Sequence, residues 1–297
     1  MNNTLQKNYP ELAKKIGLPN LWIKHEYLNE SGSHKIRLIK FLVDKNLKQN
    51  KKTFVISSSG NAAIAAAYYF NKYVKKEFSL MIFVSKNIDN SKIKRLTISA
   101  NKNKNIKIKK VARPKQSAFL WAKKNQAVFL RGSIEPNAPK SYFLLAKELL
   151  KIPNLKAVFI PTSSGITALG LHQGFSAKGG SAKSGKKIEI HIVQTEKINF
   201  LAREFDHDFK PSNKSLAGAI VDKVAFQKSS VLKMIKESCG SGWIISDKLL
   251  KKTKKLARDN GLPMVSYDAL LSLAGLIKAK EKKWPLTGAV CCIFTGR

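Results

Sequence analysis

Short apolar segments alternate with longer helical segments along most of the chain. Alternation of this kind indicates strand–helix–strand units, in which consecutive strands run parallel. We therefore predict an α/β fold of doubly wound domains with mostly parallel sheets. The expected strands cover residues 53–57, 78–84, 106–111, 127–130, 157–160, 188–193 and 289–294. The expected helices cover residues 36–42, 62–73, 90–99, 115–124, 139–150, 167–176, 229–238, 247–260 and 267–280.

Lysine dominates the charge of the chain. The sequence has 55 Lys and Arg residues against 19 Asp and Glu residues, a formal charge of +36, and only 7 of the basic residues are Arg. Lysines neutralise phosphates without regard to base sequence, whereas Arg reads phosphate and guanine through paired hydrogen bonds. The lysines also run along nearly the whole chain. We expect solvated lysine surfaces and no specific nucleic-acid partner.

The cysteine pattern and the apolar runs limit the class of protein further. Cys239, Cys291 and Cys292 give neither a disulfide framework nor zinc-ligand spacing, so no metal site is expected. The adjacent pair lies in AVCCIF, which is typical of small residues in a buried strand. No apolar run approaches the ~18–20 residues that a membrane span needs. We expect a cytoplasmic protein without a membrane partner.

Two turns in the first quarter of the chain carry residues suited to chemistry. Residues 29–37 (NESGSHKIR) form a Gly/Ser turn that leads into an apolar helix. Lys35 would lie at the positive end of the helix dipole, which lowers the pKa of an amine and suits Schiff-base formation. Residues 55–63 (VISSSGNAA) form a strand, a polar turn and a helix start, a pattern that binds carboxylates but also occurs in ordinary N-caps.

Two further turns lie in the second half of the chain. Residues 159–170 (FIPTSSGITALG) again join a strand to a helix through Ser, Gly and Thr, a geometry that binds phosphate on backbone amides. The turn is neither a Walker loop nor a dinucleotide fingerprint, so nucleotide binding is not indicated. Residues 291–297 (CCIFTGR) place the Thr295 hydroxyl at the carboxyl end of a strand, where open α/β sheets bind ligands.

In this order, and over most of the chain, the four segments resemble the tryptophan-synthase-β-like (fold type II) family of pyridoxal-phosphate enzymes. That family includes threonine synthase, cysteine synthase, and the threonine and serine dehydratases. Residues 22–29 (WIKHEYLN) resemble its K-x-E-x-x-N sequence before the cofactor lysine. The resemblance implies a large domain of residues 1–44 plus 136–297, a small mobile domain of residues 45–135 with the cofactor between them, and a homodimer.

The resemblance also implies roles for the turn residues. Lys35 would hold pyridoxal 5′-phosphate as a Schiff base and move the Cα proton, while His34 would contact the phosphate or fill space beside the lysine. Asn61 would hydrogen-bond the 3′-oxygen of the pyridine ring. Thr295 would face the pyridine nitrogen. The substrate carboxylate would be bound by Ser58, Ser59 and Gly60. The phosphate would be held by Ser163, Ser164, Gly165 and Thr167.

The implied reaction is β- or γ-elimination or replacement on a small amino acid. The Thr-Gly ending favours threonine-synthase-like chemistry, and a neutral hydroxyl at the ring nitrogen favours elimination over transamination. The Ser-Gly-x-Thr turn favours cysteine-synthase-like replacement or serine/threonine deamination instead. A non-catalytic binding protein is the other alternative, because Ser163 and Ile166 stand where the family has glycines that suit a positive φ.

Overall fold

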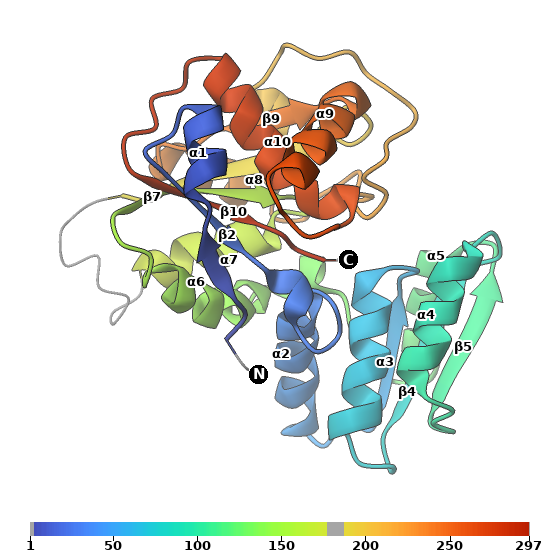
Figure 1. Cartoon of the computed structure of the whole chain (residues 1–297). Coiled ribbons are helices and arrows are strands. Elements are labelled where there is room, and N and C mark those ends of the chain that lie inside the picture. Colours follow the sequence, from blue (N-terminus) through green and yellow to red (C-terminus); the bar gives the residue numbers. More distant parts are fainter. Residues whose placement is uncertain (1–2, 177–186, 297) are drawn as a thin grey trace. The chain divides into compact units, whose positions relative to one another are not determined.

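The chain divides into two compact units, each with its own sheet (Figure 1). The computed structural model describes residues 3–176 and 187–296. One unit combines residues 1–28 with 142–297 and is called the terminal unit below; residues 29–141 form the inserted unit. The sequence predicted divisions at 44/45 and 135/136 for a mobile domain, and that assignment stays a prediction.

The inserted unit contains a four-stranded parallel sheet in the order β5-β4-β3-β6. The central strand β3 pairs with β4 from Thr53 opposite Ser79 to Ser57 opposite Phe83. Its elements are α2 (Lys35–Leu47), β3 (Thr53–Ser57), α3 (Asn61–Tyr73), β4 (Ser79–Ser85), α4 (Asn90–Ala100), β5 (Ile106–Val111), α5 (Pro114–Lys124) and β6 (Val128–Phe129).

Local sequence explains how the helices of the inserted unit begin and pack. The Asp89 carboxylate accepts the backbone N–H groups of Ser91 and Lys92 and so caps α4. Pro114 stands in the first turn of α5, where its missing N–H costs no hydrogen bond. Helix α3 buries a run of alanines, whose small side chains allow the helix to lie close to its neighbours.

The terminal unit contains a six-stranded sheet in the order β1-β2-β10-β7-β8-β9. Only the edge strand β1 runs antiparallel to its neighbour, since β1 pairs with β2 in the opposite direction. Its elements are β1 (Gln6–Asn8), α1 (Pro10–Ile16), β2 (Asn20–Lys24), α6 (Phe143–Leu149), β7 (Leu155–Pro161), α7 (Ile166–Ser176), β8 (Glu189–Thr195), α8 (Lys228–Glu237), β9 (Gly242–Ile245), α9 (Asp247–Asp259), α10 (Tyr267–Glu281) and β10 (Ala289–Ile293).

The core of the terminal unit lies around β10 and α10. Every residue of β10 is buried, and α10 buries most of its circumference, as expected where strands are covered on both faces. Cys291 and Cys292 lie in β10 and are buried, which confirms their predicted role as small strand residues. Burial raises the pKa of the Cys291 thiol to about 12, so that the thiol is neutral.

The structure confirms the predicted α/β class and the mostly parallel sheets. Most expected strands and helices occur within two residues of their predicted bounds. There are two exceptions: the helix expected over 36–42 continues to Leu47 as α2, and the helix expected over 139–150 begins as a 3-10 turn (Ala138–Tyr142) before α6. There the Ser141 hydroxyl donates to the Ala138 carbonyl and so competes with helical hydrogen bonding. The sequence did not predict β1, α1, β2 or β9. None of the described helices has the length and apolar character that a bilayer span requires.

Candidate active site

Lys35 is the first residue of α2, as the sequence predicted. The turn before it includes Gly32 at φ 79°, a left-handed conformation that glycine adopts without strain. The Arg37 N–H donates to the His34 carbonyl at 3.1 Å, which closes a tight first turn. His34 is buried and Lys35 is half-buried.

Two serines of the same turn were not predicted as functional residues. Ser31 and Ser33 are 7% and 0% exposed, and their hydroxyls have no hydrogen-bond partner among the described residues. A buried hydroxyl without a partner costs roughly 1–3 kcal/mol. Sequence reasoning recognised the Gly/Ser turn but had no means of showing that its hydroxyls are buried. The turn therefore holds two donors that a bound polar group would satisfy.

Glu30 ties this turn to the far end of α3. Its carboxylate accepts hydrogen bonds from the hydroxyls of Tyr68 and Tyr73 and from the Lys72 ammonium. The Tyr73 hydrogen bond is the largest influence on this carboxyl and helps to lower its pKa, so Glu30 remains ionised at neutral pH. The turn before Lys35 is thus held to the helix that carries the second predicted turn.

The second predicted turn lies between β3 and α3. Ser58, Ser59, Gly60 and Asn61 are all half-buried, and Asn61 is the first residue of the helix. The Gly60 N–H donates to the Ser58 hydroxyl oxygen at 3.2 Å, and Gly60 has open space on its Cβ side. A helix leaves its first N–H groups without internal partners, so this turn offers donors to an anion.

Lys35 and the Ser58–Asn61 turn belong to the same edge of the inserted unit's sheet. Helices α2 and α3 pack against each other and both begin at this edge (Figure 1). Only a short connection joins the end of α2 to the start of β3, and a 13-residue helix is about 20 Å long. The start of α2 therefore lies near the carboxyl end of β3, where α3 also begins.

The third predicted turn lies between β7 and α7 in the terminal unit. Gly165 has a φ of 88°, and a Cβ there would stand 2.6 Å from a methyl carbon of Val231. Only glycine fits this position without strain. Ser163 and Ile166 are not among the residues with a left-handed backbone, so their replacement of the family's glycines does not strain the turn.

The Ser163 hydroxyl is already used within the protein. It donates to Asp222 Oδ2 at 3.0 Å and accepts the N–H groups of Asp222 and Val221 at 3.1 and 3.4 Å. Ser163 can therefore contribute to an anion site through its backbone, whereas Ser164 is half-buried and Thr167 lies in the first turn of α7. Asp222 was not predicted, because it lies 59 residues from Ser163.

Thr295 follows β10, the strand that pairs with β7. The Phe294 N–H donates to the Lys24 carbonyl at 2.9 Å, and the Ser266 hydroxyl donates to the Gly296 carbonyl at 3.0 Å. These bonds fix the backbone on both sides of Thr295, which is buried. Because β7 and β10 are parallel neighbours, their carboxyl ends bring Thr295 and the α7 turn to one edge of the sheet.

A buried histidine packs beneath this end of β10. His25 Nε2 lies 3.1 Å from the Tyr9 hydroxyl, and Nδ1 lies 3.0 Å from the Tyr27 hydroxyl. The ring also makes an edge contact with Phe294. Burial, assisted by Lys7 and Lys24, lowers the pKa of His25 to about 4, so the ring is neutral at physiological pH. One tyrosine hydroxyl therefore donates to the ring and the other accepts from it.

Comparisons with known proteins agree with this fold. Maize serine racemase superposes with a TM-score of 0.82 at 16% identity, covering 99% of this chain and 88% of that one. The O-acetylserine dependent cystathionine beta-synthase of Helicobacter pylori gives a TM-score of 0.76 at 19% identity over 99% and 92% of the two chains. At such identities these likenesses show the fold alone.

Sequence comparison adds a short match and a long one. A threonine synthase of Methanosarcina acetivorans is 41% identical over 58 residues, which are 20% of this chain and 14% of that protein's length. The family model described as "Pyridoxal-phosphate dependent enzyme" matches residues 3–296. Since that match spans nearly the whole sequence and both units, the chain belongs to the family of pyridoxal-phosphate dependent enzymes.

Proposed function

We propose that this enzyme catalyses elimination or replacement at the β- or γ-carbon of a small amino acid, with a threonine-synthase-like reaction favoured. One observation carries the proposal: Lys35 and the Ser58–Asn61 turn stand at the starts of two helices that pack against each other at one edge of one sheet. An amine that can form a Schiff base and a turn that binds a carboxylate are the two groups that an α-amino acid substrate requires.

The residues of the terminal unit fit the cofactor of the family. The first N–H groups of α7, together with the Ser164 and Thr167 hydroxyls, are donors suited to a phosphate. Thr295 offers a hydroxyl at the carboxyl end of β10, suited to a pyridine nitrogen. When bound, pyridoxal 5′-phosphate withdraws electrons from the Cα of an attached amino acid. A neutral partner such as Thr295 leaves the ring nitrogen unprotonated, which favours elimination.

Two buried serines of the inserted unit also suit the cofactor. The buried hydroxyls of Ser31 and Ser33 lack partners among the described residues, and both belong to the turn that presents Lys35. Polar atoms buried in this way are expected to be satisfied when a ligand is bound. The residues present therefore suit a polar cofactor at Lys35, with His34 beside it.

Each group of the proposed site has a role in binding the substrate or in moving its Cα proton. Lys35 would hold the cofactor and would accept the Cα proton of the substrate. Ser58, Ser59 and Gly60 would hold the substrate carboxylate, and the Asn61 amide would hydrogen-bond the 3′-oxygen of the ring. Because the carboxylate and the amine are then fixed at two points, the Cα–H bond is oriented toward Lys35.

Two observations favour threonine-synthase-like chemistry over the alternatives. The short match to a threonine synthase is the first, and the Thr295-Gly296 pair after β10 is the second. Cysteine-synthase-like replacement and serine/threonine deamination use the same groups and remain the alternatives. The unstrained backbone at Ser163 and Ile166 supports an intact phosphate turn and counts against a non-catalytic binding protein. We also propose a homodimer, on the family resemblance.

The first experiment measures cofactor attachment. Purified protein is mixed with pyridoxal 5′-phosphate, its absorbance is recorded, and the adduct is trapped with borohydride and mapped. We expect a lysine-bound cofactor band in the wild type and in Lys40→Ala, a matched change on the same helix, but not in Lys35→Ala. A band that persists in Lys35→Ala, or no band in the wild type, refutes the assignment of Lys35.

The second experiment identifies the reaction. O-phosphohomoserine, O-acetylserine, threonine and serine are supplied separately at equal concentration, and phosphate, acetate and 2-oxoacid release are measured. We expect phosphate release from O-phosphohomoserine with formation of threonine. Turnover of another substrate without O-phosphohomoserine turnover would replace the threonine-synthase-like proposal with the corresponding alternative, while absence of all turnover in protein that carries the cofactor would favour a binding protein.

A further inference from the structure

A cavity of about 310 Å³ lies in the terminal unit, away from every residue assigned above to cofactor or substrate. It is bounded by the ends of β8 and β9, by the first turns of α9, and by the last turn of α10 with the residue that follows it. Its volume is at the lower end of the range for small-molecule sites, which begins at about 300 Å³. The cavity is therefore large enough for one small metabolite.

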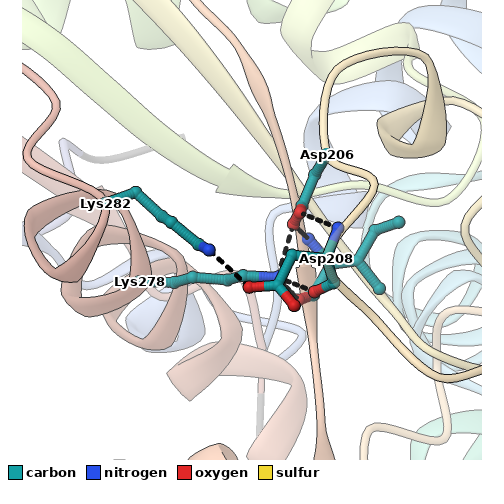
Figure 2. Close-up of polar contacts among 5 residues, drawn as sticks. Asp206, Asp208, Lys278 and Lys282 are labelled. Carbon is teal, nitrogen blue, oxygen red and sulfur yellow. Dashed lines mark hydrogen bonds and ion pairs between the residues drawn. The ribbon is translucent and has the colours of Figure 1, made fainter.

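One wall of the cavity is fixed by a buried ion pair (Figure 2). Lys278 Nζ donates to Asp206 Oδ2 at 2.7 Å, to the Asp208 carbonyl at 2.7 Å and to the Ile244 carbonyl at 2.9 Å. An ammonium has three protons, so that of Lys278 is fully used. Lys282, the residue that follows α10, forms an ion pair with the Asp208 carboxylate. These two lysines are neutralised by the protein and hold the wall in place.

Four other charged groups in the cavity are not neutralised in this way. Lys248 and Lys252 lie four residues apart on one face of α9, and Glu196 and Glu281 line the same cavity. Within the described part of the chain, none of these four forms an ion pair. Glu196 is half-buried, whereas Lys248, Lys252 and Glu281 are exposed, so without a ligand the four side chains are solvated and are available to one.

The charge pattern selects the class of ligand. An anion would satisfy Lys248 and Lys252 but would be repelled by the two glutamates, and a cation would meet the opposite problem. A zwitterion satisfies both pairs at once. Ile244 and Leu249 add apolar atoms to the lining, which suit a short hydrocarbon side chain.

We propose that this cavity is a second, non-catalytic binding site for a small α-amino acid with an apolar side chain. The carboxylate of the ligand pairs with Lys248 and Lys252, and its ammonium group pairs with Glu196 and Glu281. Because the site shares no residue with the turns around Lys35, Gly165 and Thr295, it binds its ligand without the cofactor.

The test uses a probe that cannot react at Lys35. N-methyl-L-valine is a zwitterion, but its secondary amine cannot form a neutral Schiff base with an aldehyde. We titrate it into the cofactor-loaded protein by calorimetry and record the cofactor absorbance in the same solutions. We expect saturable binding while the cofactor absorbance stays unchanged. No binding, or binding that shifts the absorbance in step with saturation, would overturn the proposal.

Variants of the cavity then identify the site. Glu196→Gln should weaken binding of N-methyl-L-valine about tenfold, and Lys252→Gln, at an exposed residue, about two- to fivefold, since each removes a charged partner. Lys251→Gln is the matched control, because Lys251 is exposed on the same helix and does not line the cavity. Unchanged affinity in both cavity variants would refute the location. Equally tight binding of sodium acetate or inorganic phosphate would refute the zwitterionic class.

Discussion

Replacing Gly165 by alanine should destabilise the protein more than an ordinary surface substitution. Gly165 adopts a φ of 88°, and an added Cβ would lie 2.6 Å from Val231 Cγ2 and 3.0 Å from Val231 Cγ1. A residue with a Cβ costs roughly 1–2 kcal/mol in a left-handed conformation. Forcing an extra carbon against a buried side chain costs roughly 1–3 kcal/mol. We therefore expect Gly165→Ala to lower the free energy of unfolding by about 2–5 kcal/mol.

Urea unfolding of the cofactor-free protein measures this loss, and a double variant separates its two parts. Val231→Ala removes both methyl groups near the added Cβ and by itself should cost roughly 2–3 kcal/mol. In Gly165→Ala/Val231→Ala the steric contact is relieved while the backbone strain remains. The double variant should therefore be less destabilised than the sum of the two single variants, by about 1–3 kcal/mol.

A control substitution at Gly60 tests whether the loss is specific to Gly165. Gly60→Ala is the control, because Gly60 has a negative φ and nothing within 4 Å of its Cβ position. That change should alter the free energy of unfolding by less than about 1 kcal/mol. If Gly165→Ala is equally mild, the turn before α7 does not need glycine. If the two single losses simply add, Val231 is not the side chain that the Cβ meets.

Three further predictions concern buried groups. The Ser33 hydroxyl has no partner within the described chain, so Ser33→Ala should leave the cofactor-free protein as stable as the wild type in urea. The same change should weaken pyridoxal 5′-phosphate binding about tenfold in a fluorescence titration. A stability loss above about 1 kcal/mol would contradict this. Because the pKa of His25 is lowered to about 4 from 6.5, the unfolded chain binds a proton in this pH window that the folded chain does not. The free energy of unfolding should therefore fall by up to about 3 kcal/mol as the pH drops from 6.5 to 4. In His25→Gln, urea titrations at different pH values should no longer show this part of the pH dependence. Asp206→Ala should cost about 3–5 kcal/mol by leaving Lys278 buried without its carboxylate. Asp206→Ala/Lys278→Met should recover only part of this loss in thermal unfolding, because the Ile244 and Asp208 N–H groups also lose Asp206 as their acceptor. No recovery in the double variant would show that the ion pair is not the cause.

The regular elements were predictable where a local pattern determines them. Strands such as β3 and β10 are continuous apolar runs, and the helices between them are long enough to show their period. Strand β1 has the sequence QKN, which carries no strand pattern, and becomes a strand only by pairing Gln6 with Lys24 across the chain. Strand β9 is four residues long, too short for periodicity to identify. Tertiary pairing determines these two strands.

In the candidate site, too, local patterns could be predicted from the sequence and long-range contacts could not. Turns that join a strand to a helix through Ser, Gly and Asn carry their anion-binding chemistry in consecutive residues, so the sequence alone located them. Burial and long-range contacts are not encoded in this way. The sequence could not show that the Ser163 hydroxyl is occupied by Asp222, or that the Ser33 hydroxyl is buried without a partner.

The distribution of the predicted groups over the two units has a consequence for kinetics. The turns that suit the phosphate and the ring nitrogen, at Gly165 and Thr295, belong to the terminal unit, whereas the carboxylate-binding turn at Ser58–Asn61 belongs to the inserted unit. Damage to the Gly165 turn should therefore weaken binding of the cofactor first. Damage at Ser59 should leave the cofactor bound and raise KM for the amino acid. Lys35 is proposed to serve both tasks, so its loss should abolish both. This difference distinguishes an enzyme with divided binding groups from a scaffold that merely holds the cofactor.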